Sequence, residues 1–311
     1  MPPKAYVAKA AHWVALHTGA SAHLAARSPS VRIIMFHGVD GQAYPLAGFE
    51  KQLRYLQGIY RVVSLEKALE ELASGQAGTG CAVLTFDDGL RNNYTNVYPV
   101  LRRLRLPAVF YVCPGLIGAG KWLWNHEARA RLRTLPDAER GALAARLGAP
   151  GSKVEAIVEW MKRLQLSRRT LVEDALRAAT DGFCPSARQR LAYDLMSWEE
   201  LGELDPELIT IGSHGLTHAI LTGLEPEALQ REVQESRSQL ERRLGRSVEH
   251  FCYPDGAIDD PVVDCVRQHY RSAVTTAPGF AGSGDDRHLL RRVATAARLP
   301  LFAWRLHRPT A

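Results

Sequence analysis

Two short motifs in this sequence combine residue types that bind a metal ion and activate water. Residues 85–89 (TFDDG) hold two adjacent carboxylates, and residues 213–218 (SHGLTH) hold two imidazoles four positions apart. Neighbouring carboxylates without a partner repel each other, so they need a cation or a division of roles. One carboxylate with two imidazoles leaves open coordination positions, which suits catalytic zinc carrying a water or a non-haem iron centre.

The second carboxylate favours hydrolysis, because it can accept a proton from a water bound to the metal. Each motif also has a plainer interpretation. Asp-Asp-Gly is common in turns, and two histidines can be unrelated surface residues. The position of the motifs argues against this, since each follows a short apolar run that predicts a buried strand. Active sites of parallel-sheet proteins gather at the carboxyl ends of their strands.

The elements that would position these motifs alternate along the chain. Short apolar runs take turns with amphipathic segments, which predicts a parallel sheet covered by helices, either doubly wound or closed into a barrel. Seven runs predict buried strands: 31–36, 60–63, 81–85, 108–112, 209–212, 251–253 and 272–275. The clearest helices are predicted at 49–56, 65–73, 97–104 and 226–244, the last ending at Gly245.

Residues 118–195 break this alternation, because no run among them predicts a strand. Helices are predicted instead at 127–147, 154–164 and 170–179. A segment of this length indicates an insertion on a loop. Residues 121–195 hold 14 basic and 9 acidic side chains, so this insertion carries a net charge of +5 out of +6 for the whole chain.

The composition is that of an ordinary globular protein. With 311 residues, 46% hydrophobic and 23% charged, it excludes collagen-like, low-complexity and disulfide-scaffold proteins. The five cysteines form no C-x-x-C pair, which indicates a reducing compartment. Residues 1–30 predict one amphipathic helix, and its histidines interrupt any run long enough for a signal peptide or a membrane span. We therefore expect a cytoplasmic protein with no nucleic-acid partner, with a place at the membrane surface as the minor alternative.

The two motifs, in this order, closely resemble the first two motifs of the polysaccharide deacetylase family, the NodB homology domain of carbohydrate esterase family four. Residues 251–256 (FCYPDG) resemble its aromatic-Pro-x-Gly motif. The resemblance covers roughly residues 31–294 apart from the insertion. It implies a distorted (β/α) barrel of about seven parallel strands over residues 31–311, with the helical insertion at 118–195. It also implies metal-dependent hydrolysis of an N-acetyl group on a sugar, usually with zinc.

The family's roles carry over to matching positions of this sequence. The metal ligands that the resemblance implies are Asp88, His214 and His218. Asp87 would be the general base, and the oxyanion would form against the metal and the backbone N–H of Asp255, which follows Pro254. Asp255 stands where many relatives have Tyr, and Cys252 where the commoner branch has Arg. These departures concern substrate contacts more than the metal chemistry.

The general acid follows from a second resemblance. Most of the family uses a histidine in a C-terminal Leu-x-x-His motif, whereas His288 and His307 stand in other surroundings. Residues 35–39 (MFHGV) resemble the Met-Tyr-His-x-Val opening of the circularly permuted branch, typified by biofilm poly-N-acetylglucosamine deacetylases. The resemblance assigns the acid to His37, with a purely structural histidine at the end of a strand as the alternative.

One late motif implies a partner for the base. Residues 290–293 (LRRV) resemble the Leu-Pro-Arg-Ile motif of the permuted branch. This implies that Arg292 pairs with Asp87 and keeps it ionised, with Arg291 as the alternative.

The basic insertion bears on the choice of substrate. We expect a saccharide on a phosphate-bearing or lipid-linked carrier, attracted by the basic insertion. The insertion also offers Trp122 and Trp124 for stacking on a sugar, although packing is their plainer role, and His126 for reaching the site. Alternative functions are a deformylase, an O-deacetylase, or a saccharide-binding barrel without turnover.

Overall fold

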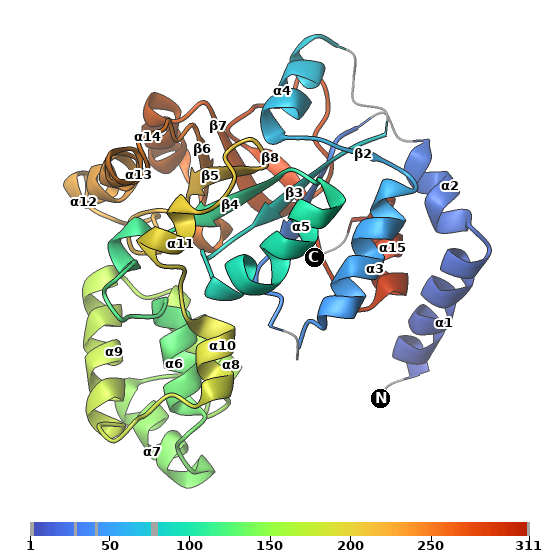
Figure 1. Ribbon diagram of the computed structural model, residues 1–311. Helices are drawn as coiled ribbons and strands as arrows, with labels where there is room; N and C mark the ends of the chain where they lie inside the picture. The colour runs from blue at the N-terminus through green and yellow to red at the C-terminus, as the bar shows by residue number, and fades with distance from the viewer. Residues whose placement is uncertain (1–2, 28–29, 41–42, 76–79, 310–311) are drawn as a thin grey trace.

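The computed structural model describes residues 3–27, 30–40, 43–75 and 80–309. Seven parallel strands close into a barrel in the order β1-β3-β4-β5-β6-β7-β8, with β8 pairing back onto β1. The ring strands are β1 Arg32–Phe36, β3 Cys81–Phe86, β4 Ala108–Val112, β5 Ile209–Ser213, β6 His250–Cys252, β7 Ser272–Pro278 and β8 Leu290–Ala294. This confirms the predicted distorted (β/α) barrel of seven parallel strands (Figure 1).

The strands of the ring differ from the seven that were predicted. Six predicted strands are in the ring, but the predicted strand at 60–63 is the two-residue β2 (Arg61–Val62), which pairs only with the start of β3. The strand that closes the barrel, β8, was not predicted. Its two adjacent arginines do not suggest a buried strand, yet Arg292 is 1% exposed because it forms an ion pair inside the barrel.

Helices wrap the barrel between successive strands, as the alternating pattern predicted (Figure 1). They are α3 Leu46–Gln57, α4 Leu65–Ala73, the π-helical turn η1 Asn93–Val97 with α5 Tyr98–Leu104, α11 Trp198–Gly202, α12 Pro226–Gln230, the π-helical turn η3 Arg231–Glu235, α13 Ser236–Leu244, α14 Asp260–His269 and α15 Leu299–Arg305. The predicted single helix at 226–244 is therefore interrupted by η3. Strand β3 is buried along its whole length, as expected for a parallel strand covered on both faces.

The N-terminal segment forms two helices where one was predicted. Helix α1 (Pro3–His17) and helix α2 (Ala20–Ala26) meet at Gly19, whose φ of 75° breaks the helix. Helix α1 packs against α15. Residues 1–2 and 28–29 of the predicted segment lie outside the described residues. In the described part of the chain, no helix has both the length and the apolar character needed to cross a membrane.

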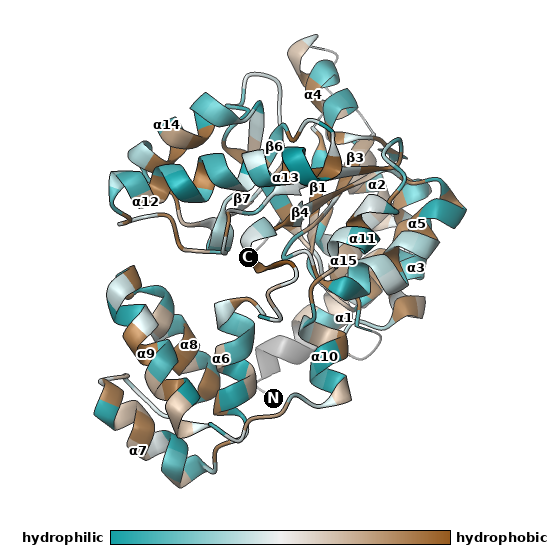
Figure 2. Ribbon diagram, turned by 60° about the vertical axis from the view of Figure 1, so that its left-hand side comes forward, coloured by the Kyte–Doolittle hydropathy of each residue, from teal (hydrophilic) through white to brown (hydrophobic). Residues whose placement is uncertain are grey.

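Five helices and no strand lie between the short 3-10 turn η2 (Pro114–Leu116), which follows β4, and helix α11. They are α6 Trp124–Leu132, α7 Asp137–Leu147, α8 Val154–Lys162, α9 Leu166–Ala179 and α10 Ala187–Tyr193. The predicted helix at 127–147 is two helices, because Pro136, which cannot lie in a helix interior, stands between the end of the first at Leu132 and the start of the second at Asp137. Apolar faces of α6, α8 and α9 pack into a hydrophobic cluster of their own (Figure 2).

Candidate active site

The turn after β3 holds two buried carboxylates in a constrained backbone. Asp87 and Asp88 are 2% and 3% exposed. The Asp87 N–H donates to the Phe36 carbonyl of β1 at 3.0 Å, and Asp88 has a φ of 73°. Gly89 also has positive φ, and a Cβ there would lie 3.1 Å from the Val112 side chain of β4. The turn therefore needs glycine at this position and holds both carboxylates at the carboxyl end of the barrel.

Asp88, His214 and His218 come together as the resemblance implied. Asp88 Oδ1 lies 3.5 Å from Nε2 of His214 and 3.5 Å from Nε2 of His218. Ligands bound tetrahedrally to zinc at about 2.1 Å lie about 3.4 Å from one another. All three side chains are buried and their donor atoms fall within 4.8 Å of one another. The donor set therefore fits a divalent cation.

The two imidazoles are oriented by neighbours. His214 Nδ1 donates to the Cys252 carbonyl at 2.7 Å, an arrangement that leaves the Nε2 lone pair facing Asp88. The 215–217 backbone leading to His218 is held by Glu232 of η3, which accepts from the N–H groups of Leu216 at 2.8 Å and Thr217 at 3.0 Å. Sequence reasoning missed Glu232, since nothing in the pattern showed that a helical Glu would turn inward.

Asp87 forms a buried bidentate ion pair with Arg292. Nη1 and Nη2 of Arg292 donate to Oδ1 and Oδ2 of Asp87, both at 2.8 Å. Arg292 also donates to the Thr275 carbonyl at 2.7 Å and to Thr85 Oγ1 at 3.1 Å. Burial alone would raise the pKa of Asp87, but Arg292 holds it below the ordinary value. The alternative partner Arg291 is exposed and lies over Gly279.

A third histidine reaches the carboxylate from the insertion. Nε2 of His126 lies 3.5 Å from Oδ2 of Asp88, on the oxygen opposite the one that faces His214 and His218. Its ring stacks on Tyr193 with centroids 4.8 Å apart. Burial lowers the pKa of His126 to about 4, so the imidazole is neutral at pH 7. Burial also opposes the charge on Asp88, but His214 and His218 hold its pKa well below the usual range.

His37 lies at the same edge of the barrel. Strands β1 and β3 pair Phe36 with Phe86, so His37 stands beside Asp87 one residue further on. Its side chain is exposed, and its charge lowers the pKa of both Asp87 and Asp88. An exposed imidazole next to the buried carboxylates can reach a substrate bound above them.

The turn after β6, which holds Pro254 and Asp255, lies at the same edge of the barrel as the two motifs. Pro254 packs against Gly215, where a Cβ would lie 3.3 Å from the proline ring, and Asp255 has a φ of 58°. Asp255 Oδ1 accepts from Nζ of Lys162, on α8 of the insertion, at 2.7 Å. This ion pair, which the sequence did not predict, links the insertion to the turn that was assigned to the oxyanion.

Comparison with known proteins identifies the family and the fold of this chain. A model of the polysaccharide deacetylase family matches residues 74–274. YxkH of Bacillus subtilis (strain 168), whose name places it among the polysaccharide deacetylases, is 20% identical over 267 residues, which cover 84% of this chain and 70% of YxkH.

Solved structures share the fold at low identity. Streptococcus pyogenes deacetylase PplD, solved in complex with acetate, has a TM-score of 0.60 and 17% identity, covering 90% of this chain and 99% of PplD. IcaB from Ammonifex degensii has a TM-score of 0.57 and 17% identity, covering 88% and 97% of the two chains.

The family match contains both motifs of the candidate site. It includes the TFDDG and SHGLTH segments and the turn after β6, whereas β1 with His37 and β8 with Arg292 lie outside it. The match spans more than half of the chain. This chain therefore belongs to the polysaccharide deacetylase family, whose members are hydrolases acting on amide bonds of acetylated sugars.

Proposed function

We propose that this protein is a zinc-dependent N-deacetylase of an amino sugar in a glycan or glycan precursor. One observation carries the proposal: the buried donors of Asp88, His214 and His218 lie at the same barrel edge as the Asp87–Arg292 pair. The first set is suited to a cation and the second to a base that stays ionised. Hydrolysis of an amide needs both, because water must be activated and the carbonyl polarised.

The roles of the side chains follow from their positions. Zinc, held by Asp88, His214 and His218, would supply a Lewis acid that polarises the acetyl carbonyl and acidifies water. Asp87 accepts the proton of the attacking water, and Arg292 keeps this carboxylate charged and oriented. The backbone N–H of Asp255 donates to the oxyanion. His37 donates a proton to the amine nitrogen as the C–N bond breaks, which leaves acetate and the free amine.

The substrate we propose is a saccharide still attached to a phosphate-bearing or lipid-linked carrier. The basic insertion supports this choice, because it lies next to the site and would attract an anionic group. A cytoplasmic location is proposed with it, supported by the five cysteines, all of which are free.

The test is acetate release by the zinc-loaded protein from N-acetylhexosamines, free, as oligomers and on phosphate carriers. Asp87→Asn should retain zinc and lose about 100-fold or more of the turnover, because it removes only the base. The exposed Asp181→Asn, which makes the same chemical change outside the site, should behave as the parent.

Two results would contradict the proposal. Full turnover by Asp87→Asn would remove the assigned base. Stoichiometric zinc without acetate from any substrate would favour a saccharide-binding barrel, and release of formate or of ester-linked acetate alone would favour the other hydrolases.

A further inference from the structure

A pocket of about 900 Å³ lies at the base of the insertion, where its two ends meet the barrel. We call it the root pocket. The barrel contributes Arg91, Leu116, Met196 and Ser197, and the insertion contributes Trp122, Phe183 and charged residues of α6, α9 and α10. Its volume is in the range of sites that enclose a small molecule of two or three rings. None of the proposed metal ligands lines it, so it is a separate compartment next to the site.

Five basic and three acidic side chains line the root pocket, a net charge of +2. Two of the acids are already neutralised. Glu200 accepts from Nε of Arg91 at 2.7 Å, and Glu127 accepts from both Arg131 and Arg177, at 2.8 and 2.9 Å. Arg91 and Glu200 pair within the barrel, and Glu127, Arg131 and Arg177 pair within the insertion.

The third acid is bound differently. Asp194 accepts a hydrogen bond from Nε1 of Trp122 at 2.8 Å, which fixes the indole in the pocket wall. This leaves Lys121 and Arg190, both exposed. Within the described ranges, neither forms an ion pair with a carboxylate. Asp194 keeps its negative charge, but Glu127 has two guanidinium partners, so the lining as a whole keeps the net charge of +2. This charge matches an anion of two charges, and the neutral hydroxyl groups of a saccharide do not require it.

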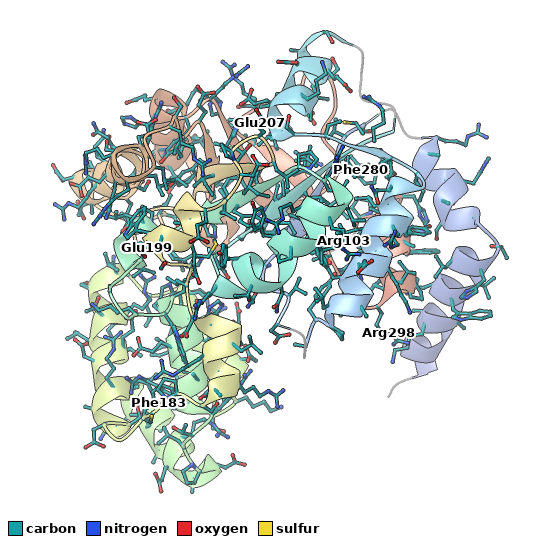
Figure 3. The ribbon with its side chains drawn as sticks, viewed as in Figure 1. Arg103, Phe183, Glu199, Glu207, Phe280 and Arg298 are labelled. Carbon is teal, nitrogen blue, oxygen red and sulfur yellow. The ribbon has the colours of Figure 1, made fainter. Side chains whose placement is uncertain are left out.

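A row of aromatic rings joins the root pocket to the candidate active site. Phe183, labelled among the insertion helices in Figure 3, is 6.3 Å from Trp122, and Trp122 is 5.3 Å from Tyr193 between ring centroids. Tyr193 in turn stacks on His126, whose Nε2 is 3.5 Å from Asp88. Arg131 covers one face of Phe183 and His126 covers one face of Tyr193, so a sugar would pack on the remaining sides of these partly exposed rings.

We propose that the root pocket binds the phosphate groups of the substrate's carrier, while the attached amino sugar extends along the ring row to Asp88. A sugar joined through a diphosphate carries two negative charges, which Lys121 and Arg190 would neutralise. The proposal deepens the proposed function and rests on it for the identity of the sugar. Phosphate binding itself can be measured without any turnover.

The probe is a nucleoside diphosphate hexose without an acetamido group, which the enzyme cannot hydrolyse, titrated calorimetrically into the zinc-loaded protein. Lys121→Gln combined with Arg190→Gln should weaken binding about tenfold or more, because two charge-assisted contacts are lost. The matched control combines Lys153→Gln with Arg188→Gln, which removes the same charge from exposed insertion residues outside the pocket. The control should bind as the parent does.

The proposal is overturned if the parent shows no binding at millimolar probe, if the pocket variant binds as tightly as the parent, or if the control loses as much affinity. A polyprenyl diphosphate hexose in micelles is titrated in parallel. Tighter binding of the polyprenyl diphosphate hexose would identify a lipid carrier, and tighter binding of the nucleoside diphosphate hexose would identify a soluble carrier. Both results would support phosphate binding in the root pocket. If no acetylated sugar is deacetylated but the probe binds as described, the proposed activity fails and the pocket assignment stands.

Discussion

Backbone strain is concentrated on the residues to which the chemistry is assigned. Among the described residues, four that are not glycine have positive φ: Asp88, Arg105, His218 and Asp255. Three of them lie at the candidate site. The left-handed conformation costs of order 1 kcal/mol or more at such residues and persists where the surroundings impose it. Glycine would remove the cost but also the side chain, so the strain is consistent with a need for these side chains.

The first prediction concerns Arg292→Met, which removes the ion pair with Asp87. Arg292 holds the pKa of Asp87 below its ordinary value of 3.8, against the effect of burial. Without the guanidinium, the largest factor that opposes burial is lost, and the pKa of Asp87 rises. The acidic limb of kcat/KM should therefore move to higher pH, and pH profiles of acetate release measure it. Arg292→Lys keeps the positive charge but cannot donate two parallel hydrogen bonds to the carboxylate. Its acidic limb should therefore lie between those of the parent and of Arg292→Met.

Arg292→Met should also lower the stability of the folded protein. The depressed pKa of Asp87 stabilises the native state above the pKa of the unfolded chain, and this stabilisation is lost as pH falls through the folded value. Leaving Asp87 buried without its partner should lower the unfolding free energy by about 3–5 kcal/mol near neutral pH. An unchanged acidic limb in a folded Arg292→Met protein would show that Arg292 does not control the base.

At the scale of elements, the apolar runs of the sequence predicted six of the seven barrel strands but not β8, the strand that closes the barrel. Buried parallel strands are continuous apolar runs, so most of the ring could be found from the sequence. Strand β8 could not, because the arginine it carries inward is paired with Asp87, a residue about 200 positions away. The motifs predicted which residues meet at the edge. The sequence offered His126 as a residue that could reach the site, and the structure places it 3.5 Å from Asp88. The contact between Lys162 and Asp255 was not predicted, since it depends on how the insertion packs.

The second prediction concerns Glu232, which lies in the π-helical turn η3. A helical pattern at 226–244 gives no sign of the extra residue, yet the turn places Glu232 under the loop that carries His218. Glu232→Gln should weaken zinc binding about tenfold, because partners that orient metal ligands contribute this much to affinity. Competition with a chromophoric chelator measures it. Glu235→Gln, an exposed change in the same turn, is the control, and equal zinc affinity in both variants would contradict the role.

At the scale of the whole molecule, the chain has separate cores. The barrel clusters contain no buried residue from 118–195, and the insertion packs around Trp124, Leu143, Val158 and their neighbours. Contacts between the two units converge on the site. They include Trp124 Nε1 on the His218 carbonyl at 3.2 Å and Lys162 on Asp255. Units with separate cores can often fold independently.

Replacing residues 122–193 by a short Gly-Ser linker is the third prediction. The Trp122 side chain reaches Asp194 at 2.8 Å, so the ends to be joined are close. The shortened protein should unfold cooperatively and bind zinc, because all three proposed ligands and the Asp87–Arg292 pair belong to the barrel. Its deacetylation of the carrier-bound sugar should fall far below that of His126→Ala, which removes one imidazole and keeps the root pocket. If the shortened chain fails to fold or to bind zinc, the insertion is part of the barrel's own folding unit. If it deacetylates as well as the intact protein, the insertion has no part in binding the substrate.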